Sequence, residues 1–369
     1  MLTRVYIDNY KCFVNFEYRP ARRQLILGAN GSGKSSLLDA LLTVRQFVIR
    51  GDKAEDLFVA ASRTRWLPDQ PRQTFEIEAQ VGESCFVYRL AIEALGDPAL
   101  PRVIEETVQC DQKPVFEFVN GEVRLYNDQF QHKVTYPFDP HQSALATIRA
   151  RPENQTLMRF VGWFGGLLCF RINPFSMGTR AEKEDLFPRV DLANFASWYR
   201  HWSQSDPNVT ARYIESLRQV LDGFGVFALK VWAEPVRLLI AEFDRSGGER
   251  LRFGFAELSE GQRCLACLYA ILHFVLAQGG TVILDEPDNF VALREIQPWL
   301  MACEDAVDEG SGQILVISHH PEILNQWAVD AGVVFRRDGV GSVRAEKFQG
   351  DPAIGLTPAE LVARGWNGE

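Results

Sequence analysis

The chain has 369 residues, a formal net charge of −9 and no long apolar run, and these properties exclude several classes of protein. A prior of about one domain per 150 residues predicts two or three lobes. With 46% hydrophobic and 24% charged residues, wholesale disorder is excluded. The acidic balance argues against a histone-like coat on nucleic acid, but it leaves room for a local basic groove. No stretch reaches the roughly 20 apolar residues of a membrane span, and the first residues lack the apolar core of a signal peptide.

Seven cysteines are scattered along the chain, an odd number that does not predict a disulfide framework. A reducing cytosol is the simplest location, so we expect a cytoplasmic protein. Cys264 and Cys267 form a CxxC pair, but no second pair of cysteines or histidines lies at the spacing of a zinc site. We therefore expect both side chains to pack within an apolar helix.

The first third of the chain predicts a strand, a loop and a helix, followed by antiparallel strands. The apolar run 25–27 is typical of a buried strand that enters a glycine-rich turn, and apolar residues recur at helical spacing over 37–48. Residues 51–73 look like a surface connection. Two-residue alternation over 75–81 and 86–92 indicates an antiparallel meander, and Asn120-Gly121 is typical of a hairpin turn.

The remainder predicts a helical lobe and an α/β half. The pattern is helical over about 143–171 and again over 192–221, and strands are expected at 226–231 and 236–243. Helices at 261–277 and 294–307 then alternate with strands at 281–284 and 314–317, and a hairpin is expected around 338–341. There is no internal repeat and no sustained heptad pattern, so we expect no coiled-coil arm.

Residues 28–35 match the phosphate-binding pattern G-x-x-x-x-G-K-S. The match lies between a predicted strand and a predicted helix, where backbone N–H groups can bind an anion. Lys34 would neutralise the β- and γ-phosphates, and the Ser35 hydroxyl would coordinate Mg²⁺. The other residues predicted to contact the nucleotide here are Asn30, Gly31, Ser32, Gly33 and Ser36. A chance match is the alternative, expected roughly once in a hundred chains of this length.

An apolar strand ends in the acidic pair Asp285-Glu286. Asp285 could hold Mg²⁺ through water, and Glu286 could orient or deprotonate the attacking water. Without a P-loop upstream, an acidic cap on a strand would be the simpler interpretation.

Two shorter motifs fit the same chemistry. Ser259, Gly261 and Gln262 stand at the beginning of a predicted helix, whose free N–H groups can bind phosphate, although Ser259 alone would be an ordinary N-cap. His319 follows the strand 314–317 and could contact the γ-phosphate, whereas His320 is more typical of a structural neighbour.

The four motifs, in this order, resemble those of the ABC-type ATPases: Walker A, the signature (here LSEGQ), Walker B with its glutamate, and the H-loop histidine. The runs RVYIDNYKCF and GANGSGKSSLLDAL are similar to the SMC, RecF and OLD branch, and DEPDN at 285–289 resembles the DEPEN run of OLD-like stand-alone ATPases. DLANF at 191–195 resembles a D-G-x-N-L stretch of the same group. The resemblance covers 1–45 and 255–325 strongly and the middle of the chain in outline.

Three positions depart from that pattern. Glu260 replaces the first glycine of the signature, and Ala292 stands where the D-loop usually carries aspartate or histidine. The Q-loop glutamine is not assignable, with Gln142 and Gln155 as its candidates.

The resemblance implies an α/β P-loop NTPase with the fold of an ABC-type head, an antiparallel β meander, an inserted helical lobe and no coiled coil. A single head would cover residues 1–369. Its parts would be a Walker A core (1–50), the meander (74–126), the helical lobe (140–224) and the half that carries the signature, Walker B and the H-loop (225–369). ATP and Mg²⁺ would be its ligands, with Ser35 and Asp285 at the metal and Lys34, Glu286 and His319 as catalytic residues.

The resemblance also implies a homodimer in which the P-loop of one chain faces Ser259 of the other across ATP. Hydrolysis to ADP and phosphate would then switch a separate effector, a nuclease or a toxin, in bacterial anti-phage defence or a toxin–antitoxin system. We expect no TOPRIM nuclease within the chain. Two alternatives stay open: a RecF-like clamp that binds DNA directly, and a structural scaffold held together by ATP. Basic residues that could contact DNA flank Trp66 (Arg63, Arg65 and Arg72) or stand at Arg149 and Arg151, although solvated loops explain them more simply.

Overall fold

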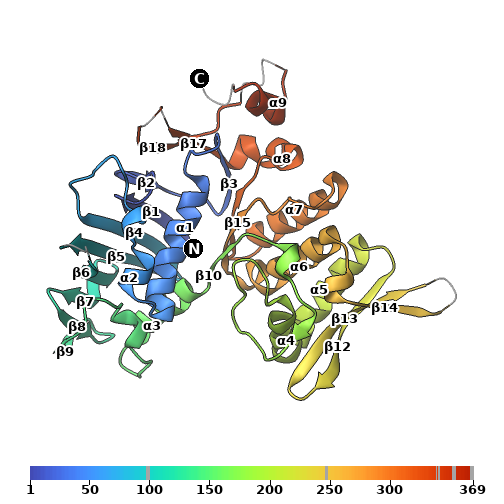
Figure 1. Cartoon of the computed structure of the whole chain (residues 1–369), viewed down its shortest axis with the longest axis horizontal. Helices are drawn as coiled ribbons and strands as arrows, with labels where there is room; N and C mark the ends of the chain where they lie inside the picture. The colour runs from blue at the N-terminus through green and yellow to red at the C-terminus, as the bar shows by residue number, and fades with distance from the viewer. Residues whose placement is uncertain (97–99, 246–247, 338, 340, 351–354, 366–369) are drawn as a thin grey trace. The chain divides into compact units, whose positions relative to one another are not determined.

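The chain has the α/β fold with an antiparallel meander that its sequence predicts (Figure 1). The computed structural model describes residues 1–96, 100–245, 248–337, 339, 341–350 and 355–365. Two compact units are present. Unit 1 comprises Met1–Ala21, Ile26–Leu167 and Gly332–Phe348, and unit 2 comprises Arg22–Leu25, Leu168–Ala331 and Gln349–Glu369. Strand β3 (Arg23–Leu27) therefore begins in unit 2 and ends in unit 1.

An eight-stranded antiparallel sheet forms most of unit 1, with the strand order β2-β1-β4-β5-β6-β7-β8-β9. Its strands are β1 (Leu2–Asp8), β2 (Phe16–Tyr18), β4 (Arg72–Val81), β5 (Ser84–Leu95), β6 (Leu100–Cys110), β7 (Lys113–Val119), β8 (Glu122–Tyr126) and β9 (His132–Pro137). Asn120 and Gly121 have φ of 53° and 84°. Positive φ at both central residues is what a two-residue type I′ turn requires, so the predicted hairpin between β7 and β8 is confirmed.

The helices of unit 1 pack beside this sheet. They are α1 (Lys34–Arg45), which continues into a π-helical turn η1 (Gln46–Arg50), α2 (Ala54–Leu57), α3 (Gln155–Gly165) and the short 3₁₀ turns η2 (Ala60–Ser62) and η3 (Leu145–Thr147). Phe160 of α3 stacks on Tyr88 of β5, with ring centroids 5.8 Å apart. Strands β17 (Gly332–Arg337) and β18 (Val343–Lys347) pair antiparallel, as the predicted hairpin requires, while residues 338 and 340 of its turn lie outside the described residues.

Unit 2 contains the parallel strands β15 (Thr281–Asp285) and β16 (Gln313–Ile317). Almost every residue of these strands is buried, as expected for parallel strands covered on both faces. The helices beside them are α6 (Glu260–Phe274), α7 (Leu293–Asp308) and α8 (Pro321–Ala331), with 3₁₀ turns η4 (Pro174–Ser176), η5 (Phe255–Glu257) and η6 (Leu276–Gln278) and a C-terminal α9 (Pro358–Ala363). Trp299 of α7 donates from its indole nitrogen to the main-chain oxygen of Leu268 at 3.0 Å, which fixes α7 against α6.

A second, antiparallel sheet of unit 2 has the strand order β11-β13-β12, with β14 paired to β13. Its strands are β11 (Arg180–Ala181), β12 (Phe224–Ala233), β13 (Val236–Asp244) and β14 (Arg250–Gly254). Tyr199 and Tyr213, from two helices, pack on Phe227 of β12 with ring centroids 5.7 and 6.4 Å away. These aromatic contacts hold the helical lobe on one face of this sheet.

Two predicted helical stretches are wrong in part. Leu167–Phe170 forms strand β10 rather than the end of a helix, because four successive buried apolar residues suit a strand covered on both faces. The stretch 192–221 is two helices, α4 (Phe195–Ser205) and α5 (Pro207–Val220). Pro207 cannot donate the N–H that would continue α4, and Asp206 caps α5 by accepting from the N–H of Val209 at 3.0 Å.

The helices in the described part of the chain are short. The longest, α7, has 16 residues, so these residues contain no coiled-coil arm. None of the described helices combines the length and the apolar character that crossing a bilayer requires.

Candidate active site

In unit 1, residues 28–33 form the loop between β3 and α1, as the P-loop pattern predicts. Gly28, Gly31 and Gly33 have φ of 143°, 79° and 101°, values that side-chain-bearing residues rarely adopt. A Cβ at Gly28 would lie 2.3 Å from the main-chain oxygen of Phe335, so β17 also requires glycine there. The loop leads directly into the N-terminus of α1, where the first N–H groups of a helix have no partner within the helix.

The side chains of this loop fit a polyphosphate. Lys34 is only 7% exposed. Its Nζ donates to the main-chain oxygens of Gly28 at 2.6 Å and Ala29 at 3.1 Å. The Ser32 hydroxyl is buried and has no hydrogen-bond partner among the described residues. A buried hydroxyl without a partner is costly, and a phosphate oxygen would relieve that cost.

An arginine and a tryptophan outside the motif lie beside the same loop. The Arg337 guanidinium is 4.3 Å from the centroid of the Trp66 ring. It also donates to the main-chain oxygen of Gly31 at 3.4 Å. The connection 51–73 is thereby tied to the P-loop. Sequence reasoning missed this contact because residues so far apart in the chain share no spacing rule.

In unit 2, β15 ends at Asp285, which the sequence predicts as a magnesium ligand. The Asp285 side chain is 9% exposed, and its Oδ2 accepts from Nε of Arg171 at 2.8 Å. Sequence reasoning missed Arg171, which stands 114 residues upstream and just after β10. The ion pair orients the carboxylate. A metal ion bound by Asp285 would compete with the Arg171 guanidinium for the same oxygen.

Glu286 follows in the left-handed conformation, with φ of 48°. Its N–H donates to the main-chain oxygen of Ile317 at 2.8 Å, and its Oε2 accepts from Nδ2 of Asn289 at 2.9 Å. A non-glycine residue in this conformation is strained, and such strain is common where a side chain must be aimed. Glu286 is thus fixed at both its main chain and its carboxylate.

The segment after β16 is bonded to the Walker B loop. The Ser318 hydroxyl donates to Asp288 at 2.6 Å and accepts from the N–H of His320 at 2.9 Å. His320 in turn accepts through Nδ1 from the N–H of Glu322 at 3.3 Å, at the beginning of α8. His319, the predicted γ-phosphate contact, is exposed. The roles predicted for the two histidines stay predictions.

The signature residues form a capping box at the beginning of α6. Ser259 Oγ accepts from the N–H of Gln262 at 3.2 Å, and Gln262 Oε1 accepts from the N–H of Ser259 at 3.0 Å. A Cβ at Gly261 would lie 2.9 Å from the main-chain oxygen of Phe290. The simple interpretation of Ser259 as an N-cap is therefore correct for the structure, and it does not exclude phosphate binding at the same helix end.

A pocket of about 430 Å³ in unit 2 opens beside Ser259. Gly261 and Gln262 line it together with Arg294 and Glu295 from the first turn of α7. Arg294 is exposed and forms no ion pair with the carboxylates that the structure describes. The carboxylates of Asp222 and Glu295 also line this pocket, and the Arg294 guanidinium next to a helix N-terminus is the part of it that would attract an anion. Arg294 was missed because it belongs to none of the four motifs.

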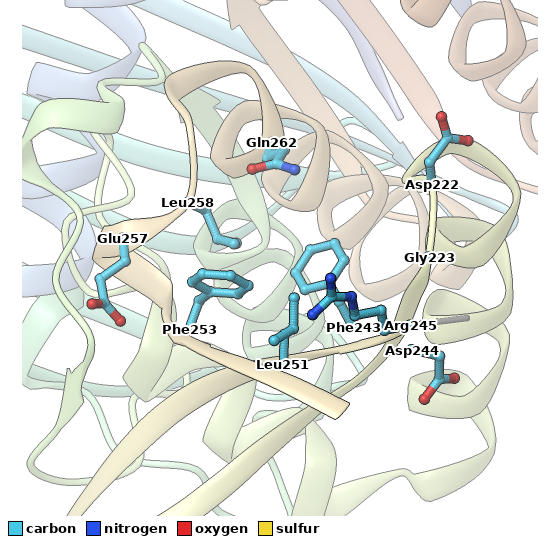
Figure 2. Close-up of a pocket in the computed structure, with 10 residues that line it drawn as sticks. All are labelled: Asp222, Gly223, Phe243, Asp244, Arg245, Leu251, Phe253, Glu257, Leu258 and Gln262. Carbon is cyan, nitrogen blue, oxygen red and sulfur yellow. The ribbon is translucent and has the colours of Figure 1, made fainter. Parts of the chain in front are cut away.

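A second pocket, of about 380 Å³, adjoins the same motif (Figure 2). Figure 2 shows Leu251 between the rings of Phe243 and Phe253, with carboxylates toward both ends. Gln262 lines both pockets. A ligand in the second pocket would therefore lie against Gln262, a residue of the capping box of α6.

Cys264 and Cys267 pack within α6, as predicted. Burial raises the pKa of the Cys264 thiol to about 12, and Cys267, with its Sγ 3.6 Å from Sδ of Met177, is shifted in the same direction by burial. Among the described residues, no three His, Cys, Asp or Glu side chains are grouped so that they could hold a metal ion.

Comparisons with known proteins agree with this geometry. A family model described as "AAA domain, putative AbiEii toxin, Type IV TA system" matches residues 25–325, and one described as "P-loop containing region of AAA domain" matches residues 2–46. No curated protein matches the chain.

Solved SMC head domains share the fold. One, bound to the C-winged helix domain of ScpA, is 12% identical with a TM-score of 0.56 and covers 94% of this chain and 98% of its own. The SMC head domain from Thermotoga maritima is 11% identical with a TM-score of 0.50, covering 95% and 99%. An SMC head with an extended coiled coil, bound to the C-terminal domain of ScpA derived from Pyrococcus furiosus, is 10% identical with a TM-score of 0.53, covering 98% of both chains. The predicted P-loop ATPase fold of the SMC-head type is confirmed.

Proposed function

Because the chain belongs to the AbiEii-type family of AAA domains, we propose that it binds and hydrolyses ATP as a switch for a separate effector protein. The observation that carries this proposal is the P-loop, where buried Lys34 and the Ser32 hydroxyl, which has no partner in the described part of the chain, surround a glycine-rich anion site. Few structural purposes explain a buried lysine held by main-chain oxygens beside such a hydroxyl. A polyphosphate explains both.

In the proposed reaction, Lys34 exchanges its main-chain oxygens for the β- and γ-phosphates of ATP. Ser35 and Asp285 would hold Mg²⁺, and the metal would supply positive charge to offset that of the phosphates. Glu286 accepts a proton from the attacking water, whose oxygen bonds to the γ-phosphorus as the bond to the ADP oxygen breaks. His319 contacts the γ-phosphate, and ADP and phosphate are released.

We further propose that two chains associate around ATP. Ser259, the N-terminus of α6 and Arg294 form an anion site that would bind the γ-phosphate held by the P-loop of a second copy. The exposed position of Arg294 supports this arrangement, since its guanidinium lacks an ion pair within the described chain. Hydrolysis would remove the shared phosphate and release the dimer.

The effector belongs to another polypeptide in this proposal. The family description names a toxin of a toxin–antitoxin system, and two of the SMC heads that resemble this chain were solved with ScpA domains bound. All seven cysteines are free, which suits a reducing cytoplasm.

The test is the mass of the purified chain by light scattering, together with its ATPase rate. Glu286→Gln should form a dimer in ATP and Mg²⁺ and revert when ATP is replaced by ADP. Lys34→Ala is the control, and it should stay monomeric and inactive. An ATP-independent mass for Glu286→Gln would contradict the dimer, and equal hydrolysis by wild type and Glu286→Gln would contradict the catalytic assignment. If Glu286→Gln assembles and functions like wild type while Lys34→Ala does neither, the scaffold alternative is correct.

A further inference from the structure

A basic groove of about 720 Å³ lies at the β9 edge of the eight-stranded sheet, within unit 1 and apart from the P-loop. One wall is formed by Tyr126 of β8 with Lys133 and Tyr136 of β9, and the other by Arg149 and Arg151 in the segment before α3. In the strand order of the described residues β9 comes last, so its outer edge has no strand beside it. The helix α3 packs beside β7 (Figure 1). Neither wall belongs to any of the four ATPase motifs.

The cations of this groove are free of ion pairs, unlike others on the same sheet. Lys133, Arg149 and Arg151 are exposed, and no described carboxylate forms a salt bridge with any of them. By contrast, Arg4 of β1 and Arg89 of β5 each form an ion pair with Glu76 of β4, the strand between them. Glu153 also lines the groove, so its three unpaired cations exceed this one carboxylate by two and form a local positive site in a chain with a net charge of −9.

The segment that carries the two arginines is held in place by Asn154. Its Oδ1 accepts from the N–H of Arg151 at 2.8 Å, and its Nδ2 donates to the main-chain oxygen of Arg149 at 3.0 Å. The two walls are also bonded to each other, because the N–H of Asp128, in the turn after β8, donates to the main-chain oxygen of Glu153 at 3.0 Å. A groove arranged before binding loses less entropy when a ligand orders its side chains.

Aromatic and apolar side chains accompany the cations. Tyr136 is half-buried opposite Val123 of β8, and Val134, two residues before it on the same face, is 42% exposed. The Tyr126 hydroxyl donates to Glu117 at 2.6 Å, which orients its ring. Phosphates prefer guanidinium and ammonium groups, whereas unpaired bases stack on aromatic rings.

We propose that this groove binds single-stranded nucleic acid. Lys133, Arg149 and Arg151 bind successive phosphates, and a base stacks on Tyr136. A single strand is favoured over a duplex because the bases of a duplex are already stacked on each other. It is favoured over an acidic peptide because the carboxylates of such a peptide would pair with the cations but would leave the ring face of Tyr136 without a stacking partner. The inference does not depend on ATP hydrolysis, and nothing in it requires the proposed dimer.

The test is fluorescence anisotropy of a labelled 20-nucleotide oligo(dT) with the full-length chain. We expect Arg149→Glu/Arg151→Glu to weaken binding at least tenfold, and Tyr136→Ala to weaken it about fivefold or more. Each phosphate contact on a single strand adds about 0.7 to the slope of log affinity against log salt, so loss of two contacts should reduce the slope by about 1.4.

The matched control is Arg344→Glu/Lys347→Glu on β18, which makes the same charge change at two exposed positions outside the groove. It should stay within twofold of wild type. All variants should retain the wild-type melting temperature and basal ATPase rate, which separates failure of this proposal from failure of the proposed function. The proposal is overturned if oligo(dT) does not bind, if the groove variant binds as tightly as the control, or if duplex DNA binds equally without dependence on Tyr136. Competition by polyglutamate or by the dinucleotide pTpT as effective as that by oligo(dT) would overturn it as well.

Discussion

At the residue scale, the contact between Arg171 and Asp285 has a consequence for metal binding. A carboxylate that coordinates Mg²⁺, directly or through water, cannot give the same oxygen fully to a guanidinium. A partly exposed ion pair is worth roughly 1 kcal/mol. Arg171→Ala should therefore lower the Mg²⁺ concentration needed for half-maximal binding of a fluorescent ATP analogue, by about fivefold.

Arg171→Lys serves as the control, because it keeps the charge while losing the planar fork of the guanidinium, and an intermediate shift is expected. A higher Mg²⁺ requirement for Arg171→Ala would show instead that Arg171 holds Asp285 in its binding position. Either result is measured in the absence of hydrolysis, so Glu286 does not affect it.

Residues within a motif could be predicted, whereas their partners could not. The P-loop, the capping serine and the acidic pair each depend on neighbours a few positions away, so local chemistry identifies them. Arg171, Arg337 and Phe290 contact the motifs through the fold. The carbonyl of Phe290 near Gly261 depends on the path of the chain after β15, which no spacing encodes.

At the element scale, the beginning of α6 combines a structural and a proposed binding role at Ser259, and two substitutions separate them. Aspartate is as good an N-cap as serine, but its charge repels phosphate. Ser259→Asp should keep the melting temperature of wild type and lose ATP-dependent association of the Glu286→Gln background. Ser259→Ala should lose about 1 kcal/mol of stability because the N–H of Gln262 loses its acceptor.

Light scattering with ATP and thermal unfolding without it measure the two effects independently. If Ser259→Asp still associates in ATP, the anion site at this helix does not face a phosphate. The capping role would then be the whole function of the signature serine.

Strand β6 carries a buried carboxyl that makes the stability of unit 1 depend on pH. Glu106 is fully buried, and burial raises its pKa to about 7 from 4.5. It accepts hydrogen bonds from Ser143 Oγ at 2.6 Å, Tyr88 Oη at 3.1 Å and the N–H of Ala144 at 3.2 Å. The pKa of Glu106 in the folded protein lies above its value in the unfolded chain. The stability that the protonated side chain contributes is therefore fully present below pH 4.5 and is lost as the pH rises through about 7.

Glu106→Gln should flatten the dependence of unfolding free energy on pH between 4.5 and 7, and it should leave the protein at least as stable as wild type at pH 8. Urea unfolding at a series of pH values measures this difference. A variant that is less stable than wild type at every pH would mean that the carboxylate's hydrogen bonds outweigh its desolvation.

Elements with a clear period were predicted well, and elements fixed by packing were not. The alternation in β4 and β5 and the Asn120-Gly121 turn follow local rules. The strand β10 is apolar at every position, and such a run fits a buried helix and a buried strand equally until its neighbours are known. The end of α4 at Asp206-Pro207 carries a local signal, since proline cannot continue a helix.

At the scale of the whole molecule, the proposed dimer makes each active site from two chains, and this can be tested by mixing two inactive variants. Lys34→Ala removes the P-loop cation, and Ser259→Asp blocks the signature. In a symmetric dimer, a heterodimer of these variants has one site without a defect and one site with both. Because neither variant is expected to form a homodimer in ATP, the dimers in the mixture are heterodimers with one intact site of two, and the mixture should recover up to about half of the wild-type ATPase rate.

Neither variant alone should hydrolyse ATP above background. A mixture of Lys34→Ala with Glu286→Gln is the matched control, since both residues are proposed to act from the same chain and no undamaged site can form. If the first mixture recovers nothing while Glu286→Gln still dimerises in ATP, the two chains associate without sharing their phosphate sites. Hydrolysis would then proceed within one chain, and the anion site beside Ser259 would serve a different ligand.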